Sequence, residues 1–424
     1  MTELTLKDRQ FIWHPYTSLA EPRENIVIES ARGMYLKTEG GKELLDAVSS
    51  WWVNIHGHSN KKIAKALAKQ AKTMEHVIFA GFTHKPAIEL AERLLEILPN
   101  NQDKLFYSDN GSTAVEVALK MCLQYWYNQK IGKKKIIALE GAFHGDTFGA
   151  MAVGERGLFT KPFQSYLFEV EFIPFPADNE ETITLEKFNL LVTKGDVAGF
   201  IYEPLVQGAA GMRIYSKEVL EQLIKIAKEH KALCIADEVM TGFGRTGKLF
   251  ASDYMTLQPD IICLSKAITG GFMPFAATSC STEVARAFQS TEVDKTLFHG
   301  HSYTANPLAC AAALASLSLL KSDECQKNIQ KIESMHNLFR EQISSHKKVK
   351  SVKSVGTIIS IEIENGETSY LNSLRNKAYD FFLGKGILLR PLGNVIYILP
   401  PYIIKRSELK KIYKAIEAFL NSLE

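Results

Sequence analysis

The chain has 424 residues, of which 46% are apolar and 23% charged, and its formal net charge is +3. These values are typical of an ordinary soluble globular protein with two or three domains and a large core. Charges of both signs are interspersed, and the most apolar long stretch is much shorter than a membrane span, so we expect neither a nucleic acid nor a membrane as partner.

The six cysteines include no C-x-x-C pair, and most of them lie in apolar runs. Such cysteines are typical of buried free thiols in a reducing compartment. The first ten residues contain no apolar segment of the kind that a secretion signal needs. The sequence therefore predicts a cytoplasmic protein.

The amino-terminal segment is rich in aromatic residues. Residues 9–17 (RQFIWHPYT) show no regular pattern, and their rings must be covered by something. We expect a flap packed on the core, with a role in a binding site as the alternative. Residues 25–46 then alternate in polarity around glycines, which predicts a small antiparallel sheet.

Two tryptophans and two histidines follow in the string SSWWVNIHGH. Adjacent residues at the end of a strand point to opposite sides, so one of Trp51 and Trp52 is expected to line a pocket while the other packs. His56 and His58 form an H-x-H pattern, but such a pattern without a third ligand is more often structural. We therefore predict no metal site here.

Regular elements are expected through the middle of the chain, from their apolar periodicity. The sequence predicts helices at 61–74, 86–98, 114–128 and 217–230, and strands at 105–107, 136–139, 199–202, 233–236 and 261–264. Strand, turn and helix thus alternate, as in the βα units of a mostly parallel sheet.

The turn before the helix at 114–128 is a candidate phosphate site. Thr113 and Glu116 stand at the spacing of a capping box. A turn of glycine and serine that opens a helix presents free N–H groups and the positive end of the helix dipole to an anion. Gly111 and Ser112 are therefore the expected phosphate contacts.

Two short apolar runs end in charged residues, Asp237 after 233–236 and Lys266 after 261–264. In a parallel sheet both would face the crevice at the carboxyl ends of the strands. A lysine there can form a Schiff base with pyridoxal phosphate, and an aspartate nearby can pair with the pyridine nitrogen. The plainer alternative is that Asp237 caps a turn and Lys266 is solvated.

Two further strand ends carry possible site residues. Phe143, beside glycines, is suited to lie flat on a planar ring. Glu203 either holds a cationic side chain, helps to orient a cofactor, or forms a salt bridge that stabilises a turn.

The string GFGRTGK at 242–248 fits the first seven positions of a phosphate-binding P-loop, but Leu249 replaces the required Ser or Thr, so nucleoside triphosphate chemistry is not expected.

The pattern changes near Leu308. A long helical stretch at 308–344 is followed by strands within 352–364, a helix at 369–383, and an apolar run that ends at Arg390. A planar guanidinium at a strand end is suited to bind a carboxylate, with a surface charge as the alternative. We predict an amino-terminal segment at 1–58 that contributes to the small domain and the active site, a large cofactor-binding domain at 59–307 and a small domain at 308–424.

The segment from Asp237 to Gly271 resembles the cofactor segment of the class III aminotransferases. The resemblance rests on DEV at 237–239, TGFGRTG at 241–247, PDII at 259–262 and SKA at 265–267. It implies an α/β protein of aminotransferase fold type I, with a mostly parallel seven-stranded sheet flanked by helices and a smaller α+β domain. It also implies pyridoxal 5'-phosphate as cofactor, with the ring between Phe143 and Val239.

Three other strings, WHPYT, SSWW and LRP, resemble the biotin-pathway branch of this family. The resemblance to the family as a whole places Ser302 on the phosphate bound by the neighbouring subunit, which implies a homodimer with a shared active site. His299 and His301 beside it repeat the H-x-H pattern, and a non-metal role is again preferred. The substrate site implied by the branch contains Tyr16, Trp51, Trp52, Phe143, Lys266, Gly300, Arg390 and Tyr397.

The branch resemblance implies ping-pong amino transfer from S-adenosylmethionine to 8-amino-7-oxononanoate, which gives 7,8-diaminononanoate for biotin. Lys266 and Asp237 would be the catalytic residues, with Lys266 moving the proton as general base and acid. Lysine as the donor, another ω-aminotransferase and a non-catalytic binding protein of the same fold remain alternatives. Phe143 stands where the family often has tyrosine, so no phenolic hydroxyl is available there.

Overall fold

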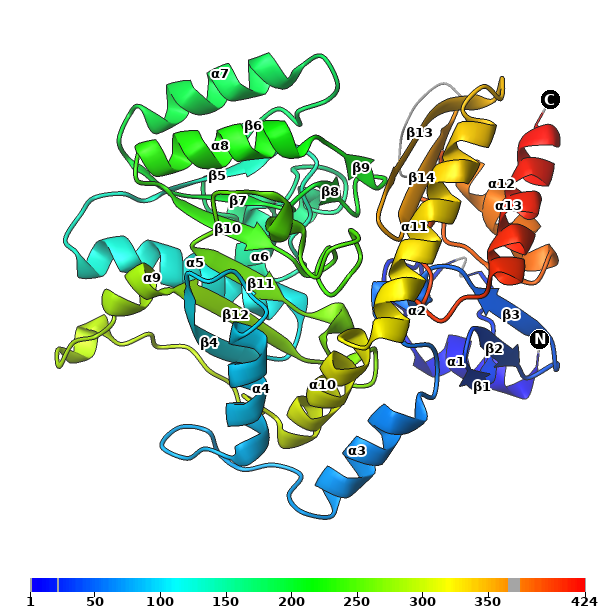
Figure 1. Ribbon diagram of the computed structural model, residues 1–424, viewed down its shortest axis with the longest axis horizontal. Coiled ribbons are helices and arrows are strands. Elements are labelled where there is room, and N and C mark those ends of the chain that lie inside the picture. The colour runs from blue at the N-terminus through cyan, green and yellow to red at the C-terminus, as the bar shows by residue number, and fades with distance from the viewer. Residues whose placement is uncertain (1, 21–22, 365–373, 424) are drawn as a thin grey trace.

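The computed structural model describes residues 2–20, 23–364 and 374–423. Its largest element is a seven-stranded sheet in the order β4-β12-β11-β10-β7-β5-β6 (Figure 1). Strand β12 runs antiparallel to its neighbours β4 and β11, and the remaining pairs are parallel. The predicted mostly parallel seven-stranded sheet is therefore confirmed. Its strands are β4 (Gln102–Ser108), β5 (Lys135–Leu139), β6 (Glu171–Ile173), β7 (Val197–Tyr202), β10 (Leu233–Asp237), β11 (Ile261–Leu264) and β12 (Ala276–Ser281).

Both faces of this sheet are buried because alternate residues of its strands enter different apolar clusters. Ile136, Ile235 and Ile261 face one cluster with helix α5, whereas Ile137 and Ile262 face the other with helix α8. Continuous apolar strands are what a sheet covered on both sides requires. The helices of this part are α4 (Lys85–Leu95), α5 (Gly111–Asn128), α6 (Phe148–Ala152), α7 (Glu181–Val192), α8 (Lys217–Glu229) and α9 (Thr282–Arg286).

The amino-terminal segment forms a second sheet with a strand from near the other end of the chain. Strands β1 (Ile28–Arg32), β2 (Tyr35–Thr38) and β3 (Glu43–Asp46) are antiparallel as predicted, and β3 pairs in parallel with β15 (Ile387–Leu388). Helix α1 (Glu3–Phe11) precedes them, so the expectation that 9–17 is wholly irregular was wrong. Phe11 and Trp13 are about three-quarters exposed, at 73% and 76%, so this chain does not cover these rings as a packed flap would.

The carboxyl-terminal elements pack beside the amino-terminal sheet, and both chain ends lie on that side of the molecule (Figure 1). The helical stretch predicted at 308–344 is two helices, because the Ser322 side chain caps a new helix. Of the helix predicted at 369–383, residues 369–373 lie outside the described residues. The elements are α10 (Pro307–Leu320), α11 (Asp323–Ile343), β13 (Val349–Val355), β14 (Ile358–Ile363), α12 (Leu374–Gly384), β16 (Val395–Ile398) and α13 (Arg406–Asn421).

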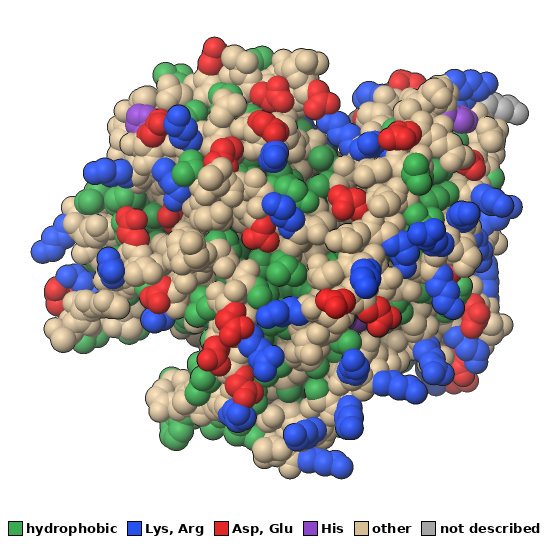
Figure 2. All heavy atoms as spheres, viewed as in Figure 1, with side chains coloured by type: hydrophobic (Ala, Val, Ile, Leu, Met, Phe, Trp, Pro, Cys, Tyr) green, Lys and Arg blue, Asp and Glu red, His purple; other side chains and the backbone are tan. Residues whose placement is uncertain are grey.

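Short elements connect these parts. They are α2 (Ser49–Trp52), α3 (Lys61–Ala71), the two-stranded sheet of β8 (Val206–Gln207) and β9 (Arg213–Ile214), and the 3-10 turns η1 (Lys161–Tyr166), η2 (Ala251–Tyr254), η3 (Lys266–Thr269) and η4 (Val293–Lys295). Charged side chains of both signs are mixed over the face shown in Figure 2. Within the described ranges, no helix combines the length and the apolar character needed to cross a bilayer.

Candidate active site

Asp237 and Lys266 lie at the carboxyl ends of two neighbouring parallel strands. Asp237 is the last residue of β10 and lies opposite Cys263 of β11, and Lys266 follows β11 as the first residue of η3. Lys266 has a φ of +45°, a conformation that is uncommon for a residue with a side chain. Lys266 is half-buried, and desolvation of its amine lowers the pKa of Lys266 from its ordinary value, opposed by the charges of Asp237 and Glu203. The two residues therefore lie at the same edge of the sheet, where the sequence predicts the crevice.

Asp237 is oriented by two hydrogen bonds. Its Oδ2 lies 2.6 Å from Nδ1 of His144, and its Oδ1 accepts a hydrogen bond of 3.1 Å from the backbone N–H of Val239. Both side chains of the Asp237–His144 pair are buried, and Nε2 of His144 has no hydrogen-bond partner among the described residues. Sequence reasoning missed His144, although it directly follows Phe143.

Glu203 supports the backbone of the same crevice. Its carboxylate accepts hydrogen bonds from the N–H groups of Phe143, at 3.0 Å, and Gly208, at 2.9 Å. These bonds lead to backbone groups rather than to a cationic side chain. Burial raises the pKa of Glu203 to about 7, an effect that His144 opposes and Asp237 reinforces. Glu203 thus anchors the backbone of Phe143, a residue that remains 38% exposed.

Gly111 and Ser112 are the first two residues of α5, as a phosphate site at a helix start requires. A methyl group at Gly111 would lie 2.8 Å from Cγ1 of Val239, so the close approach of this turn to β10 depends on glycine. Ser112 Oγ accepts a hydrogen bond from the N–H of Asp146 at 3.1 Å.

The predicted capping box of Thr113 and Glu116 was wrong. Asn110 is the N-cap, and its side chain accepts from the N–H of Thr113 while the Thr113 hydroxyl accepts from the N–H of Asn110. Glu116 instead accepts from the hydroxyl of Thr147 and the N–H of Gly149. The cap lies one turn earlier than expected because the Asn110 side chain accepts from the N–H of Thr113, so the helix already begins at Gly111.

The two tryptophans lie in a kinked helical turn rather than at the end of a strand, so that expectation was wrong. Ser49, Ser50 and Trp52 all have positive φ, at 50°, 61° and 69°. Trp51 is 40% exposed and Trp52 only 6%, so the two rings do point to different surroundings.

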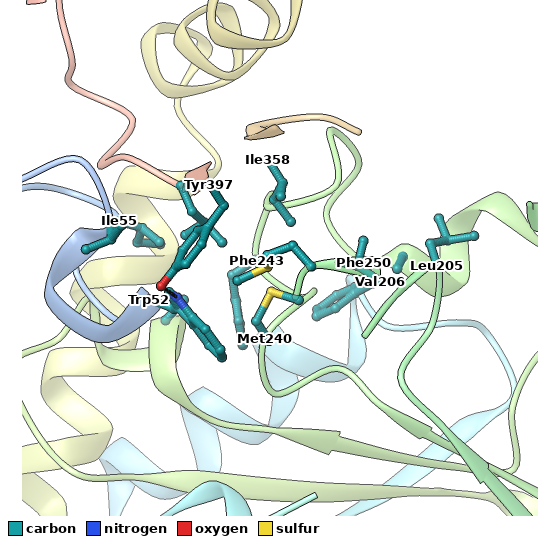
Figure 3. Close-up of a cluster of buried hydrophobic side chains, with 14 of the residues drawn as sticks. Trp52, Ile55, Leu205, Val206, Met240, Phe243, Phe250, Ile358 and Tyr397 are labelled. Atoms are coloured by element: carbon teal, nitrogen blue, oxygen red, sulfur yellow. Dashed lines mark hydrogen bonds between the residues drawn. The ribbon is translucent and has the colours of Figure 1, made fainter. Parts of the chain in front are cut away.

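Each tryptophan contacts other predicted site residues. The guanidinium carbon of Arg390 lies 4.0 Å from the ring centroid of Trp51, and the ring of Tyr16 lies 6.1 Å from the same tryptophan. Lys266 Nζ lies 4.9 Å from the ring of Trp52, whose indole N–H donates to Tyr397 Oη at 3.1 Å. Figure 3 shows Trp52 and Tyr397 pointing toward one another.

Gly300 and Ser302 lie apart from this cluster. Both are exposed in the loop between η4 and α10, and none of the contacts described above involves them. The loop is held from its own chain by Lys120, whose Nζ donates to the carbonyl of Phe298 at 2.6 Å. Ser302 is therefore exposed on the surface of the described chain.

The structure reveals two further polar residues at the site, Asp146 and Arg245. The carboxylate of Asp146 accepts a hydrogen bond from Tyr16 Oη. Arg245 is fully buried and donates to the carbonyl groups of Trp52, at 3.1 Å, and Pro400, at 2.9 Å. Arg245 belongs to the string that resembles a P-loop, but the 3-10 turn η2 follows this string instead of a phosphate-binding helix. The glycine spacing of this string suggested a P-loop and gave no signal for a buried arginine.

A family model described as aminotransferase class III matches residues 18–420. The chain belongs to the class III aminotransferases. A relative from Synechococcus elongatus, named adenosylmethionine-8-amino-7-oxononanoate aminotransferase, is 46% identical over 420 residues, which are 97% of this chain and 99% of the relative.

Solved structures of other aminotransferases share the fold. The adenosylmethionine-8-amino-7-oxononanoate aminotransferase from Methanocaldococcus jannaschii aligns with a TM-score of 0.91 and 37% identity, covering 98% of each chain. An amine transaminase from an uncultivated Pseudomonas species, in a PLP-bound form, aligns with a TM-score of 0.92 and 28% identity, covering 98% of this chain and 99% of that one. The predicted fold and the predicted aminotransferase activity are therefore confirmed.

In the part of this class III aminotransferase that the structure describes, no group of three or more His, Cys, Asp or Glu side chains is arranged to hold a metal ion. His56 Nε2 lies 2.9 Å from the carbonyl of Ser316, and His58 Nε2 lies 2.8 Å from Asp46 Oδ2. Both histidines of this H-x-H pattern therefore have protein partners.

Proposed function

We propose that the protein transfers an amino group from S-adenosylmethionine to 8-amino-7-oxononanoate and so makes 7,8-diaminononanoate for biotin synthesis. The two relatives named for this reaction, at 46% and 37% identity over nearly the full chain, support the substrate assignment. The observation that carries the chemistry is the pair of Asp237 and Lys266 at the ends of β10 and β11, beside Trp52.

The cofactor is pyridoxal 5'-phosphate, and the residues of the crevice fit it. When bound, it supplies an aldehyde that condenses with amines and a ring that accepts the electron pair of a breaking C–H bond. Asp237 is a buried carboxylate suited to a protonated ring nitrogen, and Gly111 and Ser112 offer a helix start to the phosphate. Phe143 and Val239 would lie on the two faces of the ring.

Lys266 is the residue that would hold the cofactor covalently and move the proton. Its lowered pKa leaves more of the amine unprotonated near neutral pH than an exposed lysine would have. An unprotonated amine can move a proton from the donor carbon to a carbon of the cofactor in the first half-reaction, and from that carbon to the acceptor carbon in the second. Asp237 would pair with the ring nitrogen in both half-reactions.

The acceptor pocket would be built on the two tryptophans. Arg390 stacks on Trp51 and can bind the carboxylate of the oxo acid, and Tyr16 closes the same side. Trp52 and Tyr397 would line the side nearer Lys266. Gly300 lies in the same exposed loop as Ser302, apart from this cluster, so it would join a substrate pocket across the interface of a homodimer.

We also propose a cytoplasmic homodimer in which Ser302 binds the phosphate held by the partner. The exposure of Ser302 and of the aromatic rings of Phe11 and Trp13 supports a second copy covering these surfaces. All six cysteines are buried and free, which suits a reducing compartment. Residues 59–307 would form the large domain, and 308–424 the small domain that the segment 1–58 completes.

The test is a turnover assay of the purified protein loaded with pyridoxal phosphate. S-adenosylmethionine and 8-amino-7-oxononanoate should yield 7,8-diaminononanoate, identified by mass spectrometry. If product forms only when lysine replaces S-adenosylmethionine, the donor is lysine and the assignment of the acceptor still holds. Similarity to the amine transaminase, with a TM-score of 0.92, favours a second candidate, a broader ω-aminotransferase. Turnover of 4-aminobutyrate without turnover of 8-amino-7-oxononanoate would establish that candidate instead.

A further inference from the structure

The turn that carries Trp51 and Trp52 is a backbone conformation that its own residues disfavour. Ser49, Ser50 and Trp52 have positive φ, which costs free energy in residues that carry a side chain. Such a conformation persists only where surrounding contacts fix it. The contacts that fix this turn therefore determine where the two tryptophan rings point.

A single buried carboxylate makes most of these contacts. Asp46, the last residue of β3, is fully buried. Its Oδ1 accepts from the N–H of Val48 at 3.1 Å, and its Oδ2 accepts from the N–H and hydroxyl of Ser50 at 2.7 and 3.1 Å. Asp46 thus binds the turn on the amino-terminal side of both tryptophans.

His58 completes the shell around this carboxylate. Its Nε2 lies 2.8 Å from Asp46 Oδ2, and its Nδ1 accepts a hydrogen bond of 3.1 Å from the side-chain amide of Asn54. With the amide assigned this way, Nε2 carries the proton and donates it to Asp46. The His58 side chain is only 9% exposed, so these bonds are shielded from water.

The same network reaches the loop that follows Lys266. A methyl group at Gly271 would lie 2.8 Å from Oδ1 of Asn54, and one at Gly270 would lie 3.2 Å from Cδ2 of His56. The H-x-H segment is therefore packed against the two glycines downstream of Lys266.

Asp46 is also coupled to the strand that leads to Arg390. It lies opposite Leu388 in the β3–β15 pair, and the N–H of Ala47 donates to the carbonyl of Leu388 at 3.1 Å. The hydroxyl of Ser49 donates to the carbonyl of Leu399. One carboxylate thus connects the tryptophan turn with the strand before the arginine.

We propose that Asp46 and His58 are positioning residues that hold Trp51 and Trp52 in the geometry that binds the acceptor. This inference rests on the proposed function, because it assumes that the two rings line the acceptor pocket. The hydrogen bonds of Asp46 go to Val48 and Ser50 of the turn, so Asp46 acts on the rings through this turn. Loss of the pair weakens acceptor binding while cofactor binding and the donor half-reaction continue.

The first test is Asp46→Asn, assayed as the cofactor-loaded protein. An amide cannot accept all four hydrogen bonds of the carboxylate, so buried donors lose their partner. We expect the KM for 8-amino-7-oxononanoate to rise about tenfold or more. The single-turnover rate with S-adenosylmethionine and the cofactor absorbance should stay within about twofold of the wild type, a split that general destabilisation would not produce.

Asp260→Asn is the matched control. Asp260 is also a buried carboxylate at a strand end, where it accepts from the N–H of Cys234 at 2.8 Å. It directly precedes β11, whereas Lys266 follows the other end of that strand. It should lower the melting temperature without a change in KM. An Asp46→Asn protein that behaves as this control does, or that loses the donor half-reaction equally, would overturn the proposal.

His58 gives a second pair of variants, which decide the matter if Asp46→Asn does not fold. His58→Gln keeps an N–H that can reach Asp46 and should restore most of the acceptor affinity that His58→Leu loses. Equal KM values for the two variants would contradict the positioning role.

A fluorescence measurement separates this inference from the proposed function. If the wild-type protein does not use 8-amino-7-oxononanoate, the proposed function fails, but the positioning role of Asp46 and His58 can still be tested. The difference between wild type and Trp51→Phe reports the acrylamide quenching of Trp51. Stronger quenching of that signal after His58→Leu than after His58→Gln would support the positioning role, and identical quenching would reject it.

Discussion

Asp237 and His144 form a buried carboxylate–imidazole pair, with Oδ2 and Nδ1 2.6 Å apart. The pair lies beneath the crevice in which Lys266 stands, and Asp237 raises the pKa of that lysine against the effect of burial. A carboxylate fixed by an imidazole on one oxygen and by the N–H of Val239 on the other presents its charge in one direction. This fixed direction is what a ring nitrogen in the crevice would require.

Replacing His144 by Asn should weaken binding of pyridoxal phosphate by about tenfold or more, because a buried acceptor that loses its partner costs roughly 1–3 kcal/mol. Cofactor retained after dialysis, measured by absorbance, gives the affinity. His336→Asn is the control, since His336 is equally buried but bonds Tyr413 and Thr357 in the carboxyl-terminal part. Equal loss of cofactor in both variants would argue against the role of His144.

Gly111→Ala should also reduce cofactor affinity. Its methyl group would meet Val239 Cγ1 at 2.8 Å, so either the helix start or the Val239 side chain must shift. Gly132→Ala is the matched substitution, because nothing lies within 4 Å of the added methyl group there. Titration of both variants with pyridoxal phosphate should show a difference of roughly tenfold or more. Indistinguishable affinities would show that the turn does not approach the cofactor.

Arg390→Ala should impair the half-reaction with 8-amino-7-oxononanoate far more than cofactor binding. The substrate carboxylate would lose a charged partner, which is worth about 1.5–3 kcal/mol or roughly 10- to 100-fold in kcat/KM. Arg390→Lys keeps the charge but loses the planar group that lies 4.0 Å from the ring of Trp51, so it should recover only part of the loss. Steady-state kinetics against both substrates checks this expectation, and an equal loss with donor and acceptor would refute it.

The stability of the cofactor-free protein should fall as the pH rises. Burial raises the pKa values of Glu203 and Glu238 from 4.5 to about 7, so the folded chain binds these two protons more tightly than the unfolded chain does. The stability that each proton contributes is complete below pH 4.5 and is lost as the pH rises through about 7, by up to about 3 kcal/mol per group.

Urea unfolding at pH 5 and pH 8 measures this loss. Glu203→Gln should remove part of the pH dependence, and Glu238→Gln should remove a similar part, since the two carboxyl groups have the same pKa shift. A variant whose unfolding free energy falls as steeply as that of the wild type would show that the replaced residue does not titrate in this range.

The sequence was sufficient to predict what depends on local pattern. Short apolar runs predicted β10 and β11, and the parallel arrangement then placed Asp237 and Lys266 together. The tryptophan turn was mispredicted because Asp46, four residues before Ser50, captures backbone N–H groups that a strand would have paired. This outcome depends on burial of the Asp46 carboxylate, which no local pattern reveals.

Partners that are distant in the sequence were missed for the same reason. His144 and Asp237 are 93 residues apart, and Arg245 bonds a carbonyl 155 residues away. Neither residue stands in a periodic pattern or at a distinctive spacing from its partner. The resemblance to a family directed attention to residues that face the substrate, whereas these two act from behind the crevice.

The most direct test of the account is to identify the residue that carries the cofactor. Borohydride reduction of the cofactor-loaded protein, followed by proteolysis and mass spectrometry, locates a reduced pyridoxyl group. We expect a single modified residue, Lys266, and no modification in Lys266→Ala. A pyridoxyl group on another lysine of the wild type, or none at all in a protein that turns over its substrates, would contradict it.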